Sequence, residues 1–143
     1  MMLPDVNVLI YALRSEMPQH AACRQWLLGI VDGQSQFAVS LQVLSAVVRI
    51  STNPRAFKAP SSLSTAFGFS QDLLDQPHCR IVEPGERHWP LFEKLCRDTD
   101  TRGSRMTDAW FAALAIEHGC EWITLDRDFA RFPGLKWSTP AGH

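Results

Sequence analysis

Residues 106–126, MTDAWFAALAIEHGCEWITLD, contain the pattern that decides the fold. Met106 to His118 is apolar on almost every side, which predicts a helix buried in the interior. Gly119 stands where helices commonly end in a left-handed residue. The short apolar run Trp122–Leu125 that follows predicts a strand. A buried helix leading directly into a buried strand is typical of an α/β fold.

The alternation of strand and helix continues on both sides of this stretch. Further strands are expected at Met2–Asp5, Phe37–Ser40, Arg80–Val82 and Leu135–Trp137. Helices are expected soon after Asp5 and over His20–Val31, Leu41–Ile50, residues 63–74 and Glu86–Arg97, with a polar loop over Asp98–Arg105. Because helices separate the strands, the pattern predicts a mostly parallel sheet covered on both faces.

Length and composition are those of one ordinary globular domain. The chain has 143 residues, of which 45% are apolar and 20% charged, so we expect a single domain over residues 1–143. A net charge of −1 excludes nucleic-acid binding driven by overall charge, but leaves a local basic patch open. We expect neither a signal peptide nor a membrane-spanning helix. The four scattered cysteines are expected to be free thiols in a reducing, cytoplasmic compartment.

Four aspartates stand where an α/β fold places its chemistry. Asp5 ends the first predicted strand, and Asp108 lies in the first turn of the buried helix. Asp126 comes directly after the predicted strand Trp122–Leu125, and Asp128 lies two residues further on. Ligands bind beyond the carboxyl ends of parallel strands, so these side chains can converge. Converging carboxylates need a cation or a proton. A hard divalent ion held by oxygen ligands can activate water, which predicts metal-assisted phosphodiester hydrolysis.

Each acid also has a purely structural explanation. Asp108 can stabilise the dipole of its helix, and Asp5 can cap the helix that follows it. Asp126 and Asp128 can shape a turn. Asn7 is expected to orient Asp5 or to satisfy backbone groups. Position alone therefore leaves the metal site as one hypothesis among several.

If the acids converge, several arginines near them in the sequence could rim the pocket and bind the phosphates of a nucleic acid: Arg14, Arg102, Arg105, Arg127 and Arg131. Each of them alone is better explained as a solvated surface charge. As a group beside an acidic pocket, however, they suit a nuclease better than a metal site that binds no phosphate.

The remaining polar and aromatic residues favour structural roles. Trp110 and Trp122 fall within predicted buried elements, which favours core packing over base stacking. The histidines are expected on the surface or at helix caps, and none has metal-ligand spacing: His20, His78, His88 and His118. No Gly-x-Ser-x-Gly motif and no phosphate-binding glycine loop is present, which argues against serine hydrolases, kinases and dehydrogenases.

Three motifs in order resemble the PIN-domain family across essentially the whole chain. They are DVNVLIY at 5–11, DAWFAALA at 108–115 and TLDRDF at 124–129. Within the family the chain looks most like the VapC ribonuclease toxins of bacterial toxin–antitoxin pairs. RISTNP at 49–54 and FARFPGL at 129–135 support that subgroup.

The resemblance implies a three-layer α/β/α sandwich with a central, mostly parallel sheet and cleavage of RNA that depends on Mg²⁺ or Mn²⁺. It implies that Asp5, Asp108 and Asp126 are metal ligands and that Asp128 is a further catalytic acid, acting as a ligand or through water. Toxins of this type are usually homodimers neutralised by a cognate antitoxin protein. The toxin–antitoxin complex often represses its own operon, so operator DNA is expected as a partner only through that complex.

One departure from the family concerns the helix after the second strand. The family commonly has a glutamate there, whereas residues 41–50 contain no acid, and Ala46 is the expected occupant of its position. Loss of a carboxylate should weaken a second metal more than the first. Arg49 on the same helix can lie near the pocket and contact phosphate, as Arg105 and Arg127 are expected to do. The alternative function is therefore a PIN-fold module that binds RNA or an antitoxin with weak or no cleavage.

Overall fold

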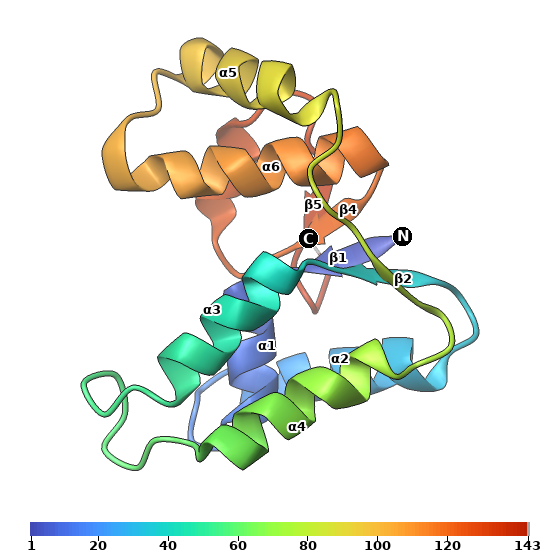
Figure 1. Ribbon diagram of the computed structural model, residues 1–143, viewed down its shortest axis with the longest axis vertical. Coiled ribbons are helices and arrows are strands. Elements are labelled where there is room, and N and C mark those ends of the chain that lie inside the picture. Colours follow the sequence, from blue (N-terminus) through green and yellow to red (C-terminus); the bar gives the residue numbers. More distant parts are fainter. Residues whose placement is uncertain (143) are drawn as a thin grey trace.

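Five short strands form two hydrogen-bonded sheets, of three and of two strands, through the middle of the molecule, with helices on both sides (Figure 1). The computed structural model describes residues 1–142. The strands are β1 (Met2–Pro4), β2 (Phe37–Val39), β3 (Cys79–Ile81), β4 (Glu121–Ile123) and β5 (Trp137–Ser138). Strand β4 lies between β1 and β5, and β2 pairs with β3. All three pairings are parallel, which confirms the expected sheet.

The helices form the two outer layers of the predicted α/β/α sandwich. On one side lie α1 (Val6–Leu13), α2 (His20–Asp32), α3 (Leu41–Ser51) and α4 (Leu63–Leu74), and on the other lie α5 (His88–Thr99) and α6 (Met106–His118). Two short 3₁₀ helices, η1 (Gly103–Arg105) and η2 (Arg127–Arg131), were not predicted. None of the helices described for residues 1–142 is long and apolar enough to cross a membrane.

Helix α5 begins two residues later than predicted. The carboxylate of Glu117, on α6, accepts hydrogen bonds from the backbone N–H groups of Gly85 (2.8 Å) and Arg87 (3.0 Å). These bonds hold the segment before His88 in a turn, so Glu86 stays outside the helix. A contact from a residue 30 or more positions away set this boundary, and no local pattern marks it.

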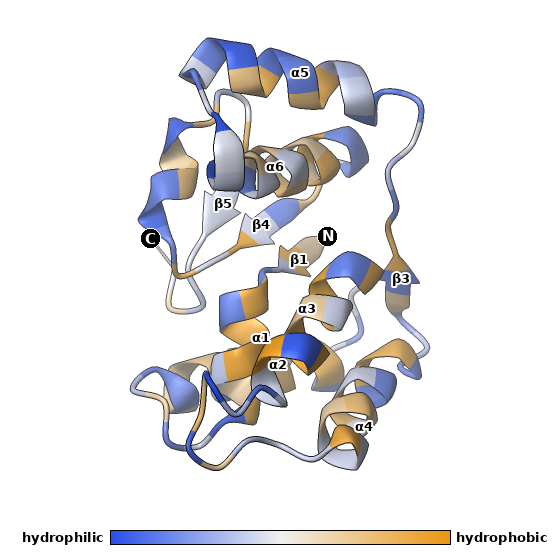
Figure 2. Cartoon of the chain, turned by 60° about the vertical axis from the view of Figure 1, so that its left-hand side comes forward, coloured by the Kyte–Doolittle hydropathy of each residue, from blue (hydrophilic) through white to orange (hydrophobic). Residues whose placement is uncertain are grey.

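Helix α6 is buried, as its apolar pattern predicts. Ala109, Ala112 and Ala113 have no exposed surface. Small side chains let this helix lie close to the sheet, where Phe111 stacks on Trp122 with ring centres 5.4 Å apart. Helices of the other layer contribute buried apolar residues to the same core, and Figure 2 marks their apolar stretches in orange. The first turn of α6, which carries Asp108, is thereby fixed at the edge of the sheet.

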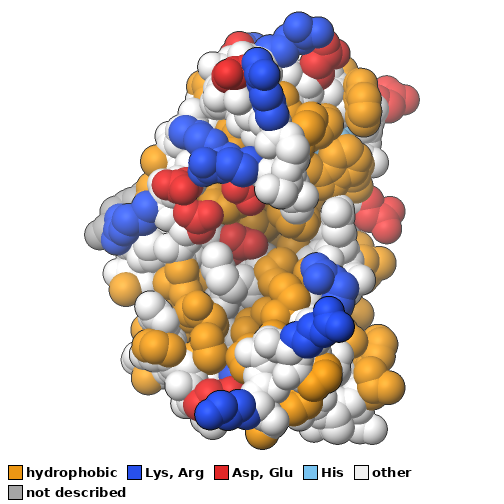
Figure 3. Space-filling model, turned by 90° about the vertical axis from the view of Figure 1, so that its left-hand side faces the viewer, with side chains coloured by type: hydrophobic (Ala, Val, Ile, Leu, Met, Phe, Trp, Pro, Cys, Tyr) orange, Lys and Arg blue, Asp and Glu red, His pale blue; other side chains and the backbone are white. Residues whose placement is uncertain are grey.

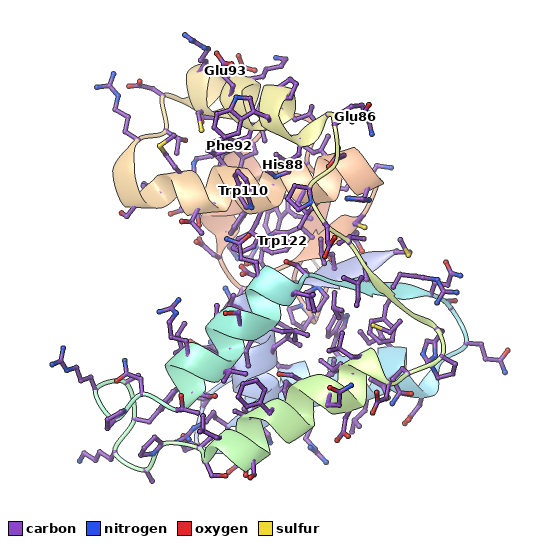
Figure 4. All side chains as sticks on the ribbon, in the orientation of Figure 1. Glu86, His88, Phe92, Glu93, Trp110 and Trp122 are labelled. Atoms are coloured by element: carbon purple, nitrogen blue, oxygen red, sulfur yellow. The ribbon has the colours of Figure 1, made fainter. Side chains whose placement is uncertain are left out.

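The tryptophan predictions are confirmed by the packing, and one histidine prediction is wrong. Trp122 is fully buried, and Trp110 is half-buried. His88 was expected on the surface, but only 1% of it is exposed, because it packs against Trp110 and Phe92 between α5 and α6 (Figure 4). Its Nε2 lies 3.0 Å from the carbonyl oxygen of Trp110, and this hydrogen bond compensates for burying the ring.

The four cysteines are free thiols in the structure, as expected. Cys23 and Cys120 are buried, and burial raises the pKa of the Cys23 thiol to about 11. A thiol that holds its proton is a weak nucleophile, so Cys23 behaves as a small apolar core residue.

We predict opposite effects on stability from two glycine substitutions. Gly119 ends α6 with φ +65°, a conformation that a side chain disfavours, so Gly119→Ala should lower the free energy of unfolding by about 1 kcal/mol. Gly29 lies within α2 and has open space around the added methyl group, so Gly29→Ala should raise it by about 0.5–1 kcal/mol. Urea denaturation measures both, and a free energy of unfolding that is unchanged in Gly119→Ala would contradict the left-handed helix end.

Candidate acidic site at the carboxyl edge of the sheet

Asp5 occupies the junction between the first strand and the first helix. Its backbone N–H donates to the carbonyl of Ile123 (2.8 Å), which continues the pairing of β1 with β4 by one residue. Its Oδ1 accepts a hydrogen bond from the N–H of Val6 (2.6 Å) and caps α1. The capping role foreseen for this residue is therefore confirmed, and the cap fixes where the carboxylate lies.

The second oxygen of Asp5 is held by side chains. Oδ2 accepts from Thr124 Oγ1 (2.7 Å) and from Asn7 Nδ2 (3.2 Å). Asn7 in turn accepts from the N–H of Leu125 at 3.2 Å, so it orients Asp5 as expected and links α1 to the end of β4. Thr124 was not predicted as a site residue. Its only signal in the sequence was its place two residues before Asp126.

Burial dominates the protonation of Asp5. Only 7% of the residue is exposed, and this burial raises the pKa of its carboxyl from 3.8 to about 6. The hydrogen bonds from Thr124 and Val6 lower the pKa, and the negative charges of Asp108 and Asp126 raise it further. The charges of Asp108 and Asp126 therefore act in the same direction as burial at Asp5.

Asp108 projects from the first turn of α6, as predicted. Arg131 Nη2 lies 3.4 Å from its Oδ2, and 30% of the Asp108 side chain is exposed. Partial burial raises the pKa of this carboxyl, Arg131 lowers it, and the charge of Asp126 raises it. The positive charge of Arg131 therefore partly balances the negative charge of Asp108.

Asp126 and Asp128 flank the start of η2. Asp126 Oδ1 accepts from the N–H of Asp128 (2.9 Å), and its own N–H donates to Thr124 Oγ1 (3.0 Å). The expectation that these acids shape a turn is confirmed. Asp128 directs its carboxylate toward Arg105 at 3.0 Å, and 67% of its side chain is exposed. Asp128 therefore lies at the rim, apart from the other three acids.

Two adjoining hollows expose these carboxylates. One, of about 330 Å³, is lined by Asp5, Asp108 and Asp126. The other, of about 420 Å³, shares Asp5 and Asp108 and continues along α3 past Ala46 and Arg49. Acidic side chains gather at the waist of this face, with basic ones directly above them (Figure 3). Three larger hollows are described elsewhere on the surface. Their linings do not include Asp5, Asp108 or Asp126.

The donors at this edge fit a hard divalent cation by their chemistry, because all of them are carboxylate oxygens. Among residues 1–142, however, no three His, Cys, Asp or Glu side chains are arranged to hold a metal ion. The Asp5 carboxylate is fixed by neutral hydrogen-bond donors, whereas Asp108 faces the positive charge of Arg131. A metal ion at this edge would therefore compete with Arg131 for Asp108.

The predicted cationic residues divide into two groups. Arg105, Arg131 and Arg49 lie at the acids or along the hollow beside them. Arg127 is exposed and lines neither hollow. The expectation that Arg14 rims the pocket is wrong. It is 9% exposed, lies over the ring of Phe57, and donates to Ser61 Oγ (3.0 Å) and to the backbone carbonyl of Ala59 (2.7 Å), away from the acids.

Arg102 was also expected at the rim. It pairs instead with Asp100 at 3.0 Å, two residues before it, and both side chains are about 80% exposed. Local pairing of this kind satisfies the charge without any contact with the acidic edge.

Comparison with known proteins identifies the fold. The sequence profile of the PIN domain matches residues 2–135. The chain belongs to the PIN-domain family. Over 140 residues this PIN domain is 39% identical to Ribonuclease VapC25 of Mycobacterium tuberculosis, which covers 98% of the chain and 99% of the relative. It is 33% identical to Ribonuclease VapC33 of the same species over 98% of each chain. The resemblance to VapC proteins is therefore confirmed.

Solved structures agree on the fold of this PIN domain. VapBC2 from Rickettsia felis, bound to a DNA fragment from its promoter, has a TM-score of 0.70 at 15% identity and covers 96% of this chain and 97% of that one. VapC20 of M. tuberculosis has a TM-score of 0.65 at 15% identity, with 95% and 99% covered. At such low identity these likenesses establish the arrangement of helices and strands.

We predict that Asp5→Asn flattens the dependence of stability on pH. The folded chain keeps the proton of Asp5 up to about pH 6, whereas the unfolded chain releases it near 3.8. The folded state thus binds more protons between these values, and the contribution of Asp5 to stability falls as the pH rises through this window. By pH 7.5 this loss amounts to about 2–3 kcal/mol.

Thermal unfolding at pH 4 and pH 7.5 tests this expectation. Asp5→Asn should gain stability relative to the original chain at pH 7.5 and much less at pH 4. Asp72→Asn removes an exposed carboxylate of α4 and serves as the matched control. The same pH dependence in Asp5→Asn as in the original chain would show that Asp5 is not the buried acid described above.

Proposed function

We propose that this PIN domain is an endoribonuclease and the toxin of a toxin–antitoxin pair. The observation that carries the proposal is the hollow lined by Asp5, Asp108 and Asp126 in a chain that matches Ribonuclease VapC25 over almost its full length. The acids come from the ends of two parallel strands and the first turn of α6. A hydrolase that acts on a polyanion can use such a site to hold cations beside the phosphate.

We infer that Mg²⁺ or Mn²⁺ is the cofactor, bound by Asp5, Asp108 and Asp126. When bound, the ion would activate water and neutralise charge on the phosphodiester. Asp5 is prepared for this role by Thr124, Asn7 and the N–H of Val6, which fix its carboxylate before any ligand arrives. No histidine lines either described hollow, so an imidazole base is not part of the proposal.

Cationic side chains beside the acids would bind the RNA backbone. Arg49 lines the hollow along α3, and Arg105 lies at the rim, where it pairs with Asp128. Asp128 would act from this rim as the further catalytic acid. Arg127 is exposed and adjoins Asp126 in the sequence, so it would contact the RNA outside the hollow. Each of these arginines offers the planar donor pair that suits phosphate oxygens.

The proposed partners follow from the relatives. Several solved neighbours are toxin–antitoxin complexes, and those from Rickettsia felis and Salmonella typhimurium are bound to DNA. We therefore propose a cognate antitoxin as partner and operator DNA through that complex. Another neighbour, VapC20, is described as cleaving the sarcin–ricin loop. A homodimer and a cytoplasmic location remain predictions.

A second candidate function rests on the surface of α3. Gln42, Ser45, Ala46 and Arg49 line the hollow there, and none of them carries a negative charge. Ala46 lines the same hollow as Asp5 and Asp108, which supports its assignment to the position of the family's usual glutamate. A site with one carboxylate fewer holds cations less tightly. The alternative is a PIN-fold module that binds RNA or antitoxin with little or no cleavage.

We predict that Asp108→Asn lowers the rate of RNA cleavage by about a hundredfold or more, the scale expected when one charged group of a preorganised site is lost. It should also abolish Mn²⁺ binding measured by calorimetry. The side chain is partly exposed, so the melting temperature should not fall. Asp98→Asn, on α5, removes a carboxylate that pairs only with Lys94 and is the control. Full cleavage by Asp108→Asn would refute the proposed site.

We also predict that Ala46→Glu tightens Mn²⁺ binding by about tenfold, because a new carboxylate then faces Asp5 and Asp108 across the hollow. Ala22→Glu adds the same charge on an exposed face of α2 and should leave the affinity unchanged. Cleavage gained by Ala46→Glu in a chain that otherwise cuts weakly would favour the binding-module alternative. An affinity no different from that of Ala22→Glu would place residue 46 outside the site.

A further inference from the structure

Arg131 is the cation with the most direct hold on the acidic hollow. It ends η2, and its Nη2 lies 3.4 Å from Asp108 Oδ2, while its Nη1 donates to the backbone carbonyl of Asp128 (2.8 Å). Its guanidinium also covers the ring of Phe132 at 4.2 Å. Only 24% of the side chain is exposed. Two of these three contacts do not involve the carboxylate.

The acids of the hollow differ in what holds them. Asp5 is held by neutral donors, namely a hydroxyl, an amide and a backbone N–H. Asp126 accepts from the backbone N–H of Asp128. Among the hydrogen bonds that the structure describes, Asp108 alone of these three is balanced by a positive side chain. An arginine therefore supplies part of the positive charge that three crowded carboxylates require.

A divalent cation and Arg131 cannot both use Asp108 fully. The guanidinium faces Oδ2 of Asp108, which an ion bound by both carboxylate oxygens would also need, and two positive charges in one hollow repel each other. Arg131 would keep its bond to the Asp128 carbonyl and its contact with Phe132 after leaving Asp108, because these contacts belong to its own segment. The freed guanidinium would then stay beside the hollow with donors available.

We propose that Arg131 exchanges partners during binding: it neutralises Asp108 until a divalent cation takes that carboxylate, and it then binds a backbone phosphate of the RNA. This inference rests on the proposed function. It makes Arg131 a competitor of the cation and a ligand of the substrate at once. When Asp108 binds the ion, Arg131 loses its negatively charged partner, and the phosphate replaces it.

The first test measures Mn²⁺ affinity by calorimetry in the absence of RNA. Arg131→Gln keeps a polar side chain of similar reach and removes the charge, so Mn²⁺ should bind about three- to tenfold more tightly than in the original chain. Arg97→Gln removes an arginine that pairs with Glu93 on the exposed side of α5, and should leave the affinity unchanged. Melting temperatures of both variants establish that they remain folded.

The second test measures binding of a single-stranded RNA oligonucleotide to the Mn²⁺-loaded protein at several salt concentrations, using only titrations in which gel electrophoresis shows that the oligonucleotide is still intact at the end. If Arg131 contacts one phosphate, the slope of log affinity against log salt should fall by about 0.7 in Arg131→Gln. It should not change in Arg97→Gln. Arg131→Lys should restore the slope and part of the competition with Mn²⁺, because it retains the charge.

The possible outcomes separate this inference from the proposed function. Tighter Mn²⁺ binding and a reduced salt slope in Arg131→Gln support the exchange. Unchanged or weaker Mn²⁺ binding in Arg131→Gln, with normal binding in the original chain, overturns the exchange and leaves the metal site intact. An unchanged salt slope overturns the contact with phosphate. No Mn²⁺ binding by any variant, with or without RNA, overturns the metal site and the exchange together.

Discussion

A buried hydrogen bond from Thr124 Oγ1 to Asp5 Oδ2, 2.7 Å long, joins two residues 119 positions apart. It forms because β1 and β4 are parallel neighbours whose carboxyl ends meet at one edge of the sheet. The same pairing places Asn7 against Leu125 and directs Asp126 toward Asp5. The acidic edge therefore depends on one strand pairing, and the helices fix the remaining acid around it.

The electrostatics of that edge follow from burial. A carboxylate as deeply buried as Asp5 is costly to ionise, and two more carboxylates beside it increase the cost. The fold reduces the cost with neutral donors at Asp5 and with arginines at Asp108 and Asp128. The site therefore combines carboxylates with arginine side chains at its rim. Such a balance suits a protein that must bring a metal ion and a polyanion together.

Helix α3 distinguishes this chain from the usual pattern of its family. It begins with a conventional cap, in which Ser40 Oγ accepts from the N–H of Val43, and it presents Ala46 and Arg49 toward the hollow. Helix α3 therefore has positions from which a further acid could reach the hollow, but the residues at these positions are neutral or positively charged. The difference between a nuclease and a binding module of the same fold therefore depends on how many carboxylates the cation needs.

Much of the fold could be predicted from local patterns. The apolar run of α6, the glycine after it and the turn residues before α4 act over a few positions, and the observed boundaries fall close to those expected. The start of α5 and the burial of His88 could not be predicted, because Glu117 and Trp110 decide them from another helix. Arg14 was misassigned for the same reason, since its partners lie in a loop some 45 residues away.

By itself the sequence determined the order of strands and helices, the three acidic motifs and the missing acid of residues 41–50. Periodicity, capping and composition are local properties, and they suffice for these features. Only the tertiary structure decided which acids share a hollow, that Thr124 holds Asp5, and that Arg131 and Arg105 rather than Arg14 and Arg102 face the carboxylates. Distances between charges depend on how the strands pair and how the helices pack, and no pattern within a single segment contains them.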